Sequence, residues 1–211
     1  MEINEIALDG LRKKILEQMS EKRARHSLEV EKMVARLAEL YVPEKKQTLR
    51  AAALLHDITK EYKTDLQIEL CRNYGIELRD TDVYAPKTLH ARTAAAMIPE
   101  NYPEFNDEEI ISCVRWHTTG RGGMTLEEKL LYLADYIDMS RMFPDCVRLR
   151  GIFFDAHPEN MEYAERLAHL DRTLLVSFDM TMRGLLAENT PISEDSIKAR
   201  NEIAIQLLKS R

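Results

Sequence analysis

The chain has 211 residues, of which 45% are hydrophobic and 31% are charged, and its formal net charge is −6. This composition is typical of a globular protein, and the length is sufficient for one domain with a sizeable core. The negative charge argues against binding to nucleic acids or anionic membranes through bulk electrostatics, but it leaves room for an anionic small molecule held by local cations or a metal ion.

Hydrophobic residues recur with helical spacing in the first half of the chain. Residues 22–40 carry an apolar stripe that begins at His26. Residues 46–58 carry a second stripe, which runs through Leu49 and ends at His56. A histidine that continues such a stripe is expected to be buried, and a buried ionisable group needs a partner.

Two further helices are expected in the middle of the chain. Residues 107–117 form one, with Asn106 or Asp107 as its N-cap. Residues 125–139 form the other, behind a Thr-x-x-Glu capping box from Thr125 to Glu128.

The last part of the chain, residues 159–209, predicts two more amphipathic helices that are interrupted near the string NTPIS. Alternation of apolar and polar residues with a period of two, the pattern of strands, is almost absent. The sequence therefore predicts a single all-α domain.

The start and the cysteines indicate a cytoplasmic protein. The first residues, MEINEIALDGLRKK, are acidic and amphipathic rather than the apolar core of a signal peptide, and the longest apolar run, AAALL, is too short to span a bilayer. Cys71, Cys113 and Cys146 are odd in number and far apart, so we expect reduced, structural thiols.

Four histidines and two aspartates interrupt or border the apolar faces. They are His26, His56, Asp57, His90, His117 and Asp135. Taken singly, a histidine on an apolar face is more often a packed core residue than a ligand, and a buried aspartate is usually paired with an arginine or a helix N-terminus. Six such residues together indicate a shared partner, and a metal ion is the partner that imidazole and carboxylate satisfy together.

The donor types restrict the kind of metal site. Nitrogen and oxygen donors without a thiolate favour an open catalytic site over a closed structural zinc site, and iron, manganese, cobalt, magnesium and zinc all fit these donors. Six candidates exceed the needs of one four-coordinate ion. They suit a pair of ions about 3.5–4 Å apart, with Asp57 as the natural bridge beside His56.

These residues resemble a known pattern. The order of His26, His56-Asp57 and Asp135 matches the H…HD…D motif of the HD-domain phosphohydrolases, which are all-helical metalloenzymes. The strings RHSLEV, LLHDITK, TLHARTAA, RWHTTGRGGMTLEEKLLYLADYIDMSR and FP together resemble the YqeK family of HD-domain proteins, from about residue 20 to 145 and more weakly beyond. The family usually has an aromatic residue after HD, where this chain has Ile58. The resemblance implies one HD-type helical bundle over residues 1–211 with additional C-terminal helices.

The YqeK family is similar to symmetrical bis(5'-nucleosyl)-tetraphosphatases, which hydrolyse diadenosine tetraphosphate to two ADP. The resemblance implies one or two divalent metal ions as cofactors, with iron favoured and manganese, cobalt, magnesium or zinc as alternatives. It implies these ligands for a first ion: His26, His56, Asp57 and Asp135. His90 and His117 would complete a second ion or hold its water.

The resemblance also implies residues that act on the substrate. Asp57 and Lys60 are the candidate catalytic residues. The candidate substrate-binding residues are Arg25, Lys60, Thr118, Thr119, Gly120 and Arg141. Lys60 follows Asp57 by about one helical turn, so its ammonium could reach a phosphate, and Arg141 could clamp phosphate with two hydrogen bonds. The alternatives are a solvated lysine at a helix end, a surface ion pair for the arginine, and a turn merely shaped by residues 118–120.

Other functions fit the same residues. A nucleoside triphosphatase, a nucleotidase or a (p)ppGpp hydrolase would use this site on another nucleotide, and a nucleotide-binding sensor would keep the metal for structure alone. The full ligand set and Lys60 favour an enzyme, because a sensor does not need an open metal position. We expect a nucleotide substrate, no nucleic acid, no membrane, and a homodimer as the candidate assembly.

Overall fold

The computed structural model describes residues 3–209, and in that range the chain forms α-helices, short 3₁₀ helices and no strand. The α-helices are α1 Glu5–Leu16, α2 Glu21–Tyr41, α3 Lys46–Leu55, α4 Thr64–Asn73, α5 Asp80–Tyr84, α6 Leu89–Asn101, α7 Glu108–Trp116, α8 Leu126–Ile137, α9 Pro144–Phe154, α10 Tyr163–Ala187 and α11 Glu194–Lys209. The 3₁₀ helices are η1 Pro43–Lys45, η2 Pro86–Thr88, η3 Pro103–Phe105 and η4 Pro158–Asn160. The predicted all-α fold is confirmed.

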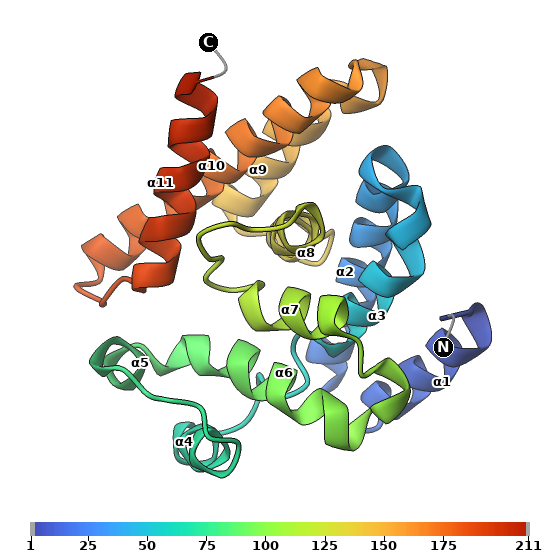
Figure 1. Ribbon diagram of the computed structural model, residues 1–211, viewed down its shortest axis with the longest axis vertical. Coiled ribbons are helices and arrows are strands. Elements are labelled where there is room, and N and C mark those ends of the chain that lie inside the picture. Colours follow the sequence, from blue (N-terminus) through green and yellow to red (C-terminus); the bar gives the residue numbers. More distant parts are fainter. Residues whose placement is uncertain (1–2, 210–211) are drawn as a thin grey trace.

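Four helices, α2, α3, α7 and α8, form the centre of the molecule. Helix α2 packs against α3 and α8, and α7 packs against α3, α6 and α8. Figure 1 shows α8 end-on in the middle, with α2 and α3 on one side of it and α7 and α6 below. All but one of the predicted metal ligands lie on, or directly after, these four helices; His90 lies on the neighbouring α6.

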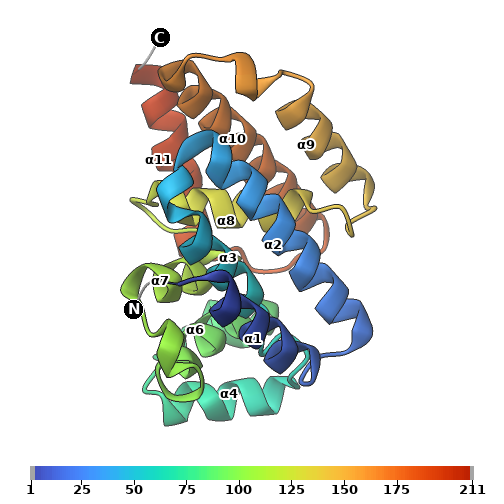
Figure 2. The ribbon, with the colours of Figure 1, turned by 90° about the vertical axis from the view of Figure 1, so that its right-hand side faces the viewer.

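The C-terminal helices cover the other side of α8. Helices α9 and α10 both contact α8, and α11 packs on α10. Figure 2 shows these three helices at the top of the molecule, with α1 and α4 at the opposite end. The ring of Phe178 on α10 stacks on Tyr132 of α8 with 4.7 Å between centroids. One hydrophobic cluster contains buried side chains from α1, such as Leu8, through to α11, such as Ile203.

The helix caps agree with the sequence. Asp107, rather than Asn106, caps α7 by accepting from the backbone N–H groups of Glu109 and Ile110. Thr125 and Glu128 form the predicted capping box of α8. The NTPIS string separates α10 from α11, as predicted.

Helix α3 ends three residues earlier than the sequence predicts. It stops at Leu55, and residues 56–60 continue as tight turns, in which Lys60 N donates to Asp57 O at 3.0 Å. Tertiary hydrogen bonds replace the helical ones here. Thr59 Oγ1 donates to His90 O at 2.8 Å, and Gln67 Nε2 donates to Thr59 O at 2.5 Å. Such tertiary hydrogen bonds compete with the helical ones, and the spacing of apolar residues in the sequence does not predict them.

Within residues 3–209, none of the helices combines the length and the apolar character that crossing a membrane would require.

Candidate metal centre

The structure brings the six predicted residues together at the centre of the bundle. His26 comes from α2, His90 from α6 and Asp135 from α8, whereas His56-Asp57 and His117 directly follow α3 and α7. We call these six residues the His/Asp cluster. Three overlapping trios within it have donor atoms that all lie within 4.8 Å of one another: His26, His56 and Asp57; His56, His117 and Asp135; and Asp57, His90 and His117.

Backbone carbonyls fix the orientation of three of the imidazole rings. Nδ1 of His56 lies 2.6 Å from Ala53 O, and Nδ1 of His117 lies 2.7 Å from Val114 O. Nδ1 of His90 makes the same contact, at 2.7 Å, with the carbonyl three residues before it. A carbonyl can only accept, so each Nδ1 carries the ring proton and each Nε2 of the neutral ring presents a lone pair to the cluster.

Asp57 lies between two groups of ligand atoms. Its Oδ2 lies 3.3 Å from His56 Nε2 and 3.6 Å from His26 Nε2. Asp135 Oδ1 completes this first group, at 3.0 Å from His26 Nε2. The other carboxylate oxygen, Asp57 Oδ1, faces a second group made by His90 and His117.

The nitrogen atoms of the second group have polar neighbours outside the cluster. The Nε2 atoms of His90 and His117 lie 3.0 Å apart, and Asp57 Oδ1 lies 3.2 Å from the former and 3.7 Å from the latter. Thr118 Oγ1 lies within 3.1 Å of both nitrogens, and Lys60 Nζ lies 3.2 Å from His90 Nε2. Thr118 and Lys60 can therefore donate hydrogen bonds to the lone pairs of His90 Nε2 and His117 Nε2. The Nε2 atoms of His26 and His56 in the first group have no such donor in the described chain.

Unpaired atoms show that a cation fits the cluster. Within the described chain, His26 Nε2, His56 Nε2 and Asp57 Oδ1 are buried and have no hydrogen-bond partner. Buried acceptors that face one another repel unless a positive charge lies between them, and leaving them unpaired is costly. Nitrogen and oxygen donors without a thiolate suit a divalent transition metal or magnesium. The buried cluster is therefore consistent with divalent metal binding.

The electrostatics of the cluster keep its carboxylates ionised. Burial would raise the pKa of Asp57, but the histidines around it, His56 foremost, hold it well below its usual range. Burial likewise opposes ionisation of Asp135, and the charge of Arg141 outweighs it, so this pKa is also lowered. Burial lowers the pKa of His90 to about 4, which keeps that ring neutral. The two ionised carboxylates and the neutral ring of His90 together attract a cation.

His26 is oriented differently from the other three histidines. Its Nδ1 lies 3.3 Å from Oδ2 of Asp138, a carboxylate that is 0% exposed, and 3.3 Å from Ser140 Oγ. Burial would lower the pKa of His26, but the nearby carboxylates of Asp135 and Asp138 outweigh it and raise the pKa to about 9, so a metal ion bound at Nε2 would displace a proton. The sequence analysis missed Asp138, although its position three residues after Asp135 is the signal that could have found it.

Two predicted basic residues lie at the cluster, and a third basic residue was not predicted. Lys60 is partly buried beside His90, and burial lowers its pKa. Arg141 forms ion pairs with Asp135 and, at 3.4 Å, with Asp138. Arg23, which the sequence analysis did not single out, forms an ion pair with Asp57 Oδ2.

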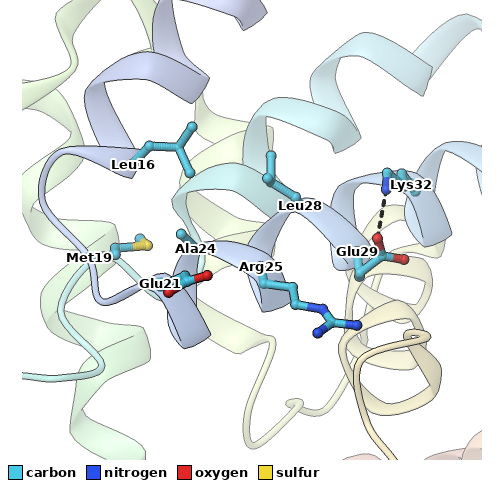
Figure 3. A pocket seen from close by; sticks show the side chains of 8 residues that line it. All are labelled: Leu16, Met19, Glu21, Ala24, Arg25, Leu28, Glu29 and Lys32. Atoms are coloured by element: carbon cyan, nitrogen blue, oxygen red, sulfur yellow. Dashed lines mark hydrogen bonds and ion pairs between the residues drawn. The ribbon is translucent and has the colours of Figure 1, made fainter.

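Arg25 lies away from the His/Asp cluster. Its side chain is exposed and lines a surface groove between α1 and α2 with Leu16, Met19 and Leu28, and none of the six cluster residues lines this groove (Figure 3). Successive helical residues point about 100° apart, so Arg25 cannot share the direction of its neighbour His26. Arg23 precedes His26 by three residues and does share its face, and that spacing is the sequence signal for it.

Of the three substrate-binding candidates in the HTTG turn, one lies at the cluster and two lie in contacts with the neighbouring backbone or with α10. Thr118 Oγ1 contacts the second group, whereas Thr119 Oγ1 donates to the carbonyl of Gly120 at 2.9 Å. Gly120 has a φ of +63°, and a Cβ built on it would lie 2.8 Å from Phe178. Its tight packing against α10 favours the turn-shaping alternative over contact with substrate.

Comparison with known proteins agrees with this geometry. The model of the HD domain family matches residues 23–140, which contain the whole cluster. The chain belongs to the HD-domain family. A symmetrical bis(5'-nucleosyl)-tetraphosphatase of Staphylococcus aureus is 34% identical over 66% of this chain and 70% of its own length. A Bacillus subtilis protein of the same name is 29% identical over 89% of this chain and 92% of its own.

A solved structure supports the fold over nearly the full length. The crystal structure of a predicted HD superfamily hydrolase involved in NAD metabolism, from Clostridium acetobutylicum, superposes with a TM-score of 0.80 at 32% identity. The match covers 94% of this chain and 97% of that one. This HD-domain phosphohydrolase, with its buried His/Asp metal cluster, is thus related to the symmetrical tetraphosphatases, as the YqeK resemblance predicted.

Proposed function

We propose that this protein hydrolyses diadenosine tetraphosphate at its central bridge and releases two ADP. The observation that carries the proposal is the match, over 89% of the chain, to proteins named as symmetrical bis(5'-nucleosyl)-tetraphosphatases, in a chain that keeps the whole His/Asp cluster. The reaction needs positive charge, because the oxygens of a polyphosphate repel an incoming nucleophile.

The His/Asp cluster supplies the ligands. His26, His56, Asp57 Oδ2 and Asp135 would hold a first divalent ion, and His90, His117 and Asp57 Oδ1 would hold a second. A divalent metal bound there supplies charge that neutralises phosphate oxygens and activates water for attack on phosphorus. Iron is our favoured metal, although the donor set suits several.

Residues of the chain itself would position the polyphosphate. Lys60 Nζ lies 3.2 Å from His90 Nε2 in the second group, and from there its ammonium would contact oxygens of the phosphate under attack. Arg141 is about one-third exposed beside Asp135, so part of its guanidinium is available to the departing nucleotide. Thr118 would donate its hydroxyl proton to the same phosphate. Each donor would stabilise charge that develops during the reaction.

A substrate panel tests the proposal. Purified protein loaded separately with Fe²⁺ under anaerobic conditions, Mn²⁺, Co²⁺, Mg²⁺ or Zn²⁺ is incubated with diadenosine tetraphosphate, ATP, AMP or ppGpp, and the products are separated by chromatography. We expect kcat/KM to be highest for diadenosine tetraphosphate. Faster turnover of ATP, AMP or ppGpp would replace the proposed substrate, and binding without turnover of any of them would indicate a sensor.

A further inference from the structure

A side chain outside the HD family match holds the turn that follows α8. Arg150 on α9 donates through Nε to Ile137 O at 2.7 Å, and through Nη2 to the carbonyls of Asp138 and, at 2.8 Å, Arg141. The family model ends at residue 140, before α9 begins. A planar guanidinium has five N–H donors, so it can donate to several carbonyls at once. The turn after α8 is therefore held by a residue from the C-terminal helices.

The turn orients His26 through Asp138. The Asp138 carboxylate is fully buried, and its Oδ1 accepts from the backbone N–H of Ser140 at 2.7 Å and from the Ser140 hydroxyl. Its Oδ2 lies 3.3 Å from His26 Nδ1. Because the Ser140 hydroxyl proton is used by Asp138, Ser140 Oγ can only accept from His26. The hydrogen bond to Ser140 therefore places a ring proton on Nδ1, so Nε2 is the nitrogen that a metal ion would take, and Asp138 acts on His26 mainly by orienting the Ser140 hydroxyl.

The same turn carries Arg141, whose guanidinium pairs with Asp135 in the first group of ligand atoms. The other three histidines differ from His26, because each is oriented by a carbonyl three residues before it in its own segment. Loss of the turn should therefore disturb the first group and leave the rings of the second group in place.

We propose that Arg150 is a positioning residue for the metal centre. By clasping the turn of residues 137–141 it holds Asp138 against His26 and Arg141 against Asp135. The inference rests on the metal centre of the proposed function, but not on which nucleotide is hydrolysed.

Metal binding by the full-length chain tests this role without reference to activity. Arg150→Gln and Asp138→Asn are compared with wild type, and Arg148→Gln, at an exposed arginine on the same helix, is the matched control. Protein stripped by chelation is titrated with Co²⁺ in a calorimeter, and visible absorption reports the ligand geometry. We expect Co²⁺ at the first group of ligand atoms to bind about 10- to 100-fold more weakly in both variants, with an altered absorption spectrum. The control should match wild type.

A double variant distinguishes positioning from general stability. If Arg150 acts through Asp138, then Arg150→Gln with Asp138→Asn should lose no more affinity than the weaker-binding single variant. Arg150→Lys should recover part of the affinity, because an ammonium donates to some of the three carbonyls but lacks the planar fork.

The opposing outcomes are equally definite. Unchanged Co²⁺ affinity in Arg150→Gln, with a lower melting temperature, would show that Arg150 only ties α9 to α8, and additive losses would show that it does not act through Asp138. Wild-type protein that bound no Co²⁺ would overturn the metal centre and the proposed function with it, whereas equal binding by wild type and variants would overturn only the role of Arg150.

Discussion

Asp57 Oδ1 lies 3.2 Å from His90 Nε2, and no proton is available to join the two atoms. His90 donates its one ring proton from Nδ1 to a backbone carbonyl, and burial lowers the pKa of the ring to about 4, so at neutral pH Nε2 carries only a lone pair. The Lys60 ammonium, 3.2 Å from the same nitrogen, supplies positive charge there. A second metal ion would have to displace it.

The first prediction follows from the central place of Asp57. Asp57→Asn keeps the size of the side chain but removes the charge that faces both groups. We expect metal content to fall below one ion per chain and kcat/KM to fall by about 10³ or more, since charge stabilisation is usually the largest single contribution to such catalysis. Elemental analysis and steady-state kinetics measure the two effects.

The control for Asp57 is Asp155→Asn, which neutralises an exposed aspartate after α9. Circular dichroism should show the same helical content in both variants. An Asp57→Asn protein with two metals per chain and wild-type activity would remove Asp57 from the ligand set.

The two groups should differ in affinity. His26 Nε2 and His56 Nε2 have no hydrogen-bond partner in the described chain, whereas His90 and His117 already face Lys60 and Thr118. We therefore expect two binding steps in a Mn²⁺ titration, a tight one at the first group and a weaker one at the second.

Alanine variants assign these two steps. His56→Ala should remove the tight step, and His90→Ala should remove only the weak one and slow turnover more than it weakens nucleotide binding. His157→Ala, at an exposed histidine paired with Glu159, is the control. If His90→Ala still bound two ions, the two-ion arrangement would have to be abandoned.

Lys60 should act on rate rather than on metal assembly. Lys60→Ala removes a point charge near the proposed phosphate position but none of the donors of the first group. We expect kcat/KM to fall by about 10²- to 10³-fold, by analogy with the loss of one oxyanion donor, while the tight metal remains. Lys63→Ala, at an exposed lysine before α4, should retain full activity. Equal kcat/KM for the two variants would show that Lys60 takes no part in the reaction.

The position of the broken bond provides a fourth prediction. Attack at the central bridge of diadenosine tetraphosphate gives ADP as the sole nucleotide product, and in ¹⁸O-labelled water half of that ADP carries the label. Mass spectrometry of an early time point measures both quantities. Equal amounts of AMP and ATP would instead indicate attack at an outer phosphate, which would refute the symmetrical reaction but not the metal centre.

The last prediction concerns Gly120 and stability. Gly120 and Gly123 both have a positive φ, +63° and +67°, so alanine strains the backbone at either site, by about 1 kcal/mol. At Gly120 the new Cβ would also lie 2.8 Å from Phe178, whereas at Gly123 the nearest atom outside the adjacent residues, on Arg121, is 3.9 Å away. Overpacking adds about 1–3 kcal/mol, so chemical denaturation should show a larger loss for Gly120→Ala. Equal losses would mean that Phe178 moves aside freely.

The sequence by itself determined the position of several helices and the polar side chains that interrupt their apolar faces. Apolar periodicity identified α2, α7, α8, α10 and α11. Local caps, Asn106 or Asp107 for α7 and the Thr125–Glu128 box for α8, indicated where two of these helices start, because capping depends on neighbours two or three residues away. The same periodicity placed His56 on a buried stripe, and the structure buries it completely.

Only the tertiary structure decided what the interrupting residues face. After α3 ends at Leu55, Thr59 donates a hydrogen bond to the backbone carbonyl of His90, a contact with another helix. Asp57 Oδ2 faces His26 from α2, and Asp57 Oδ1 faces His90 from α6. Arg150 reaches the turn after α8 from another helix. Such contacts join segments far apart in the chain, and spacing along one helix carries no information about them.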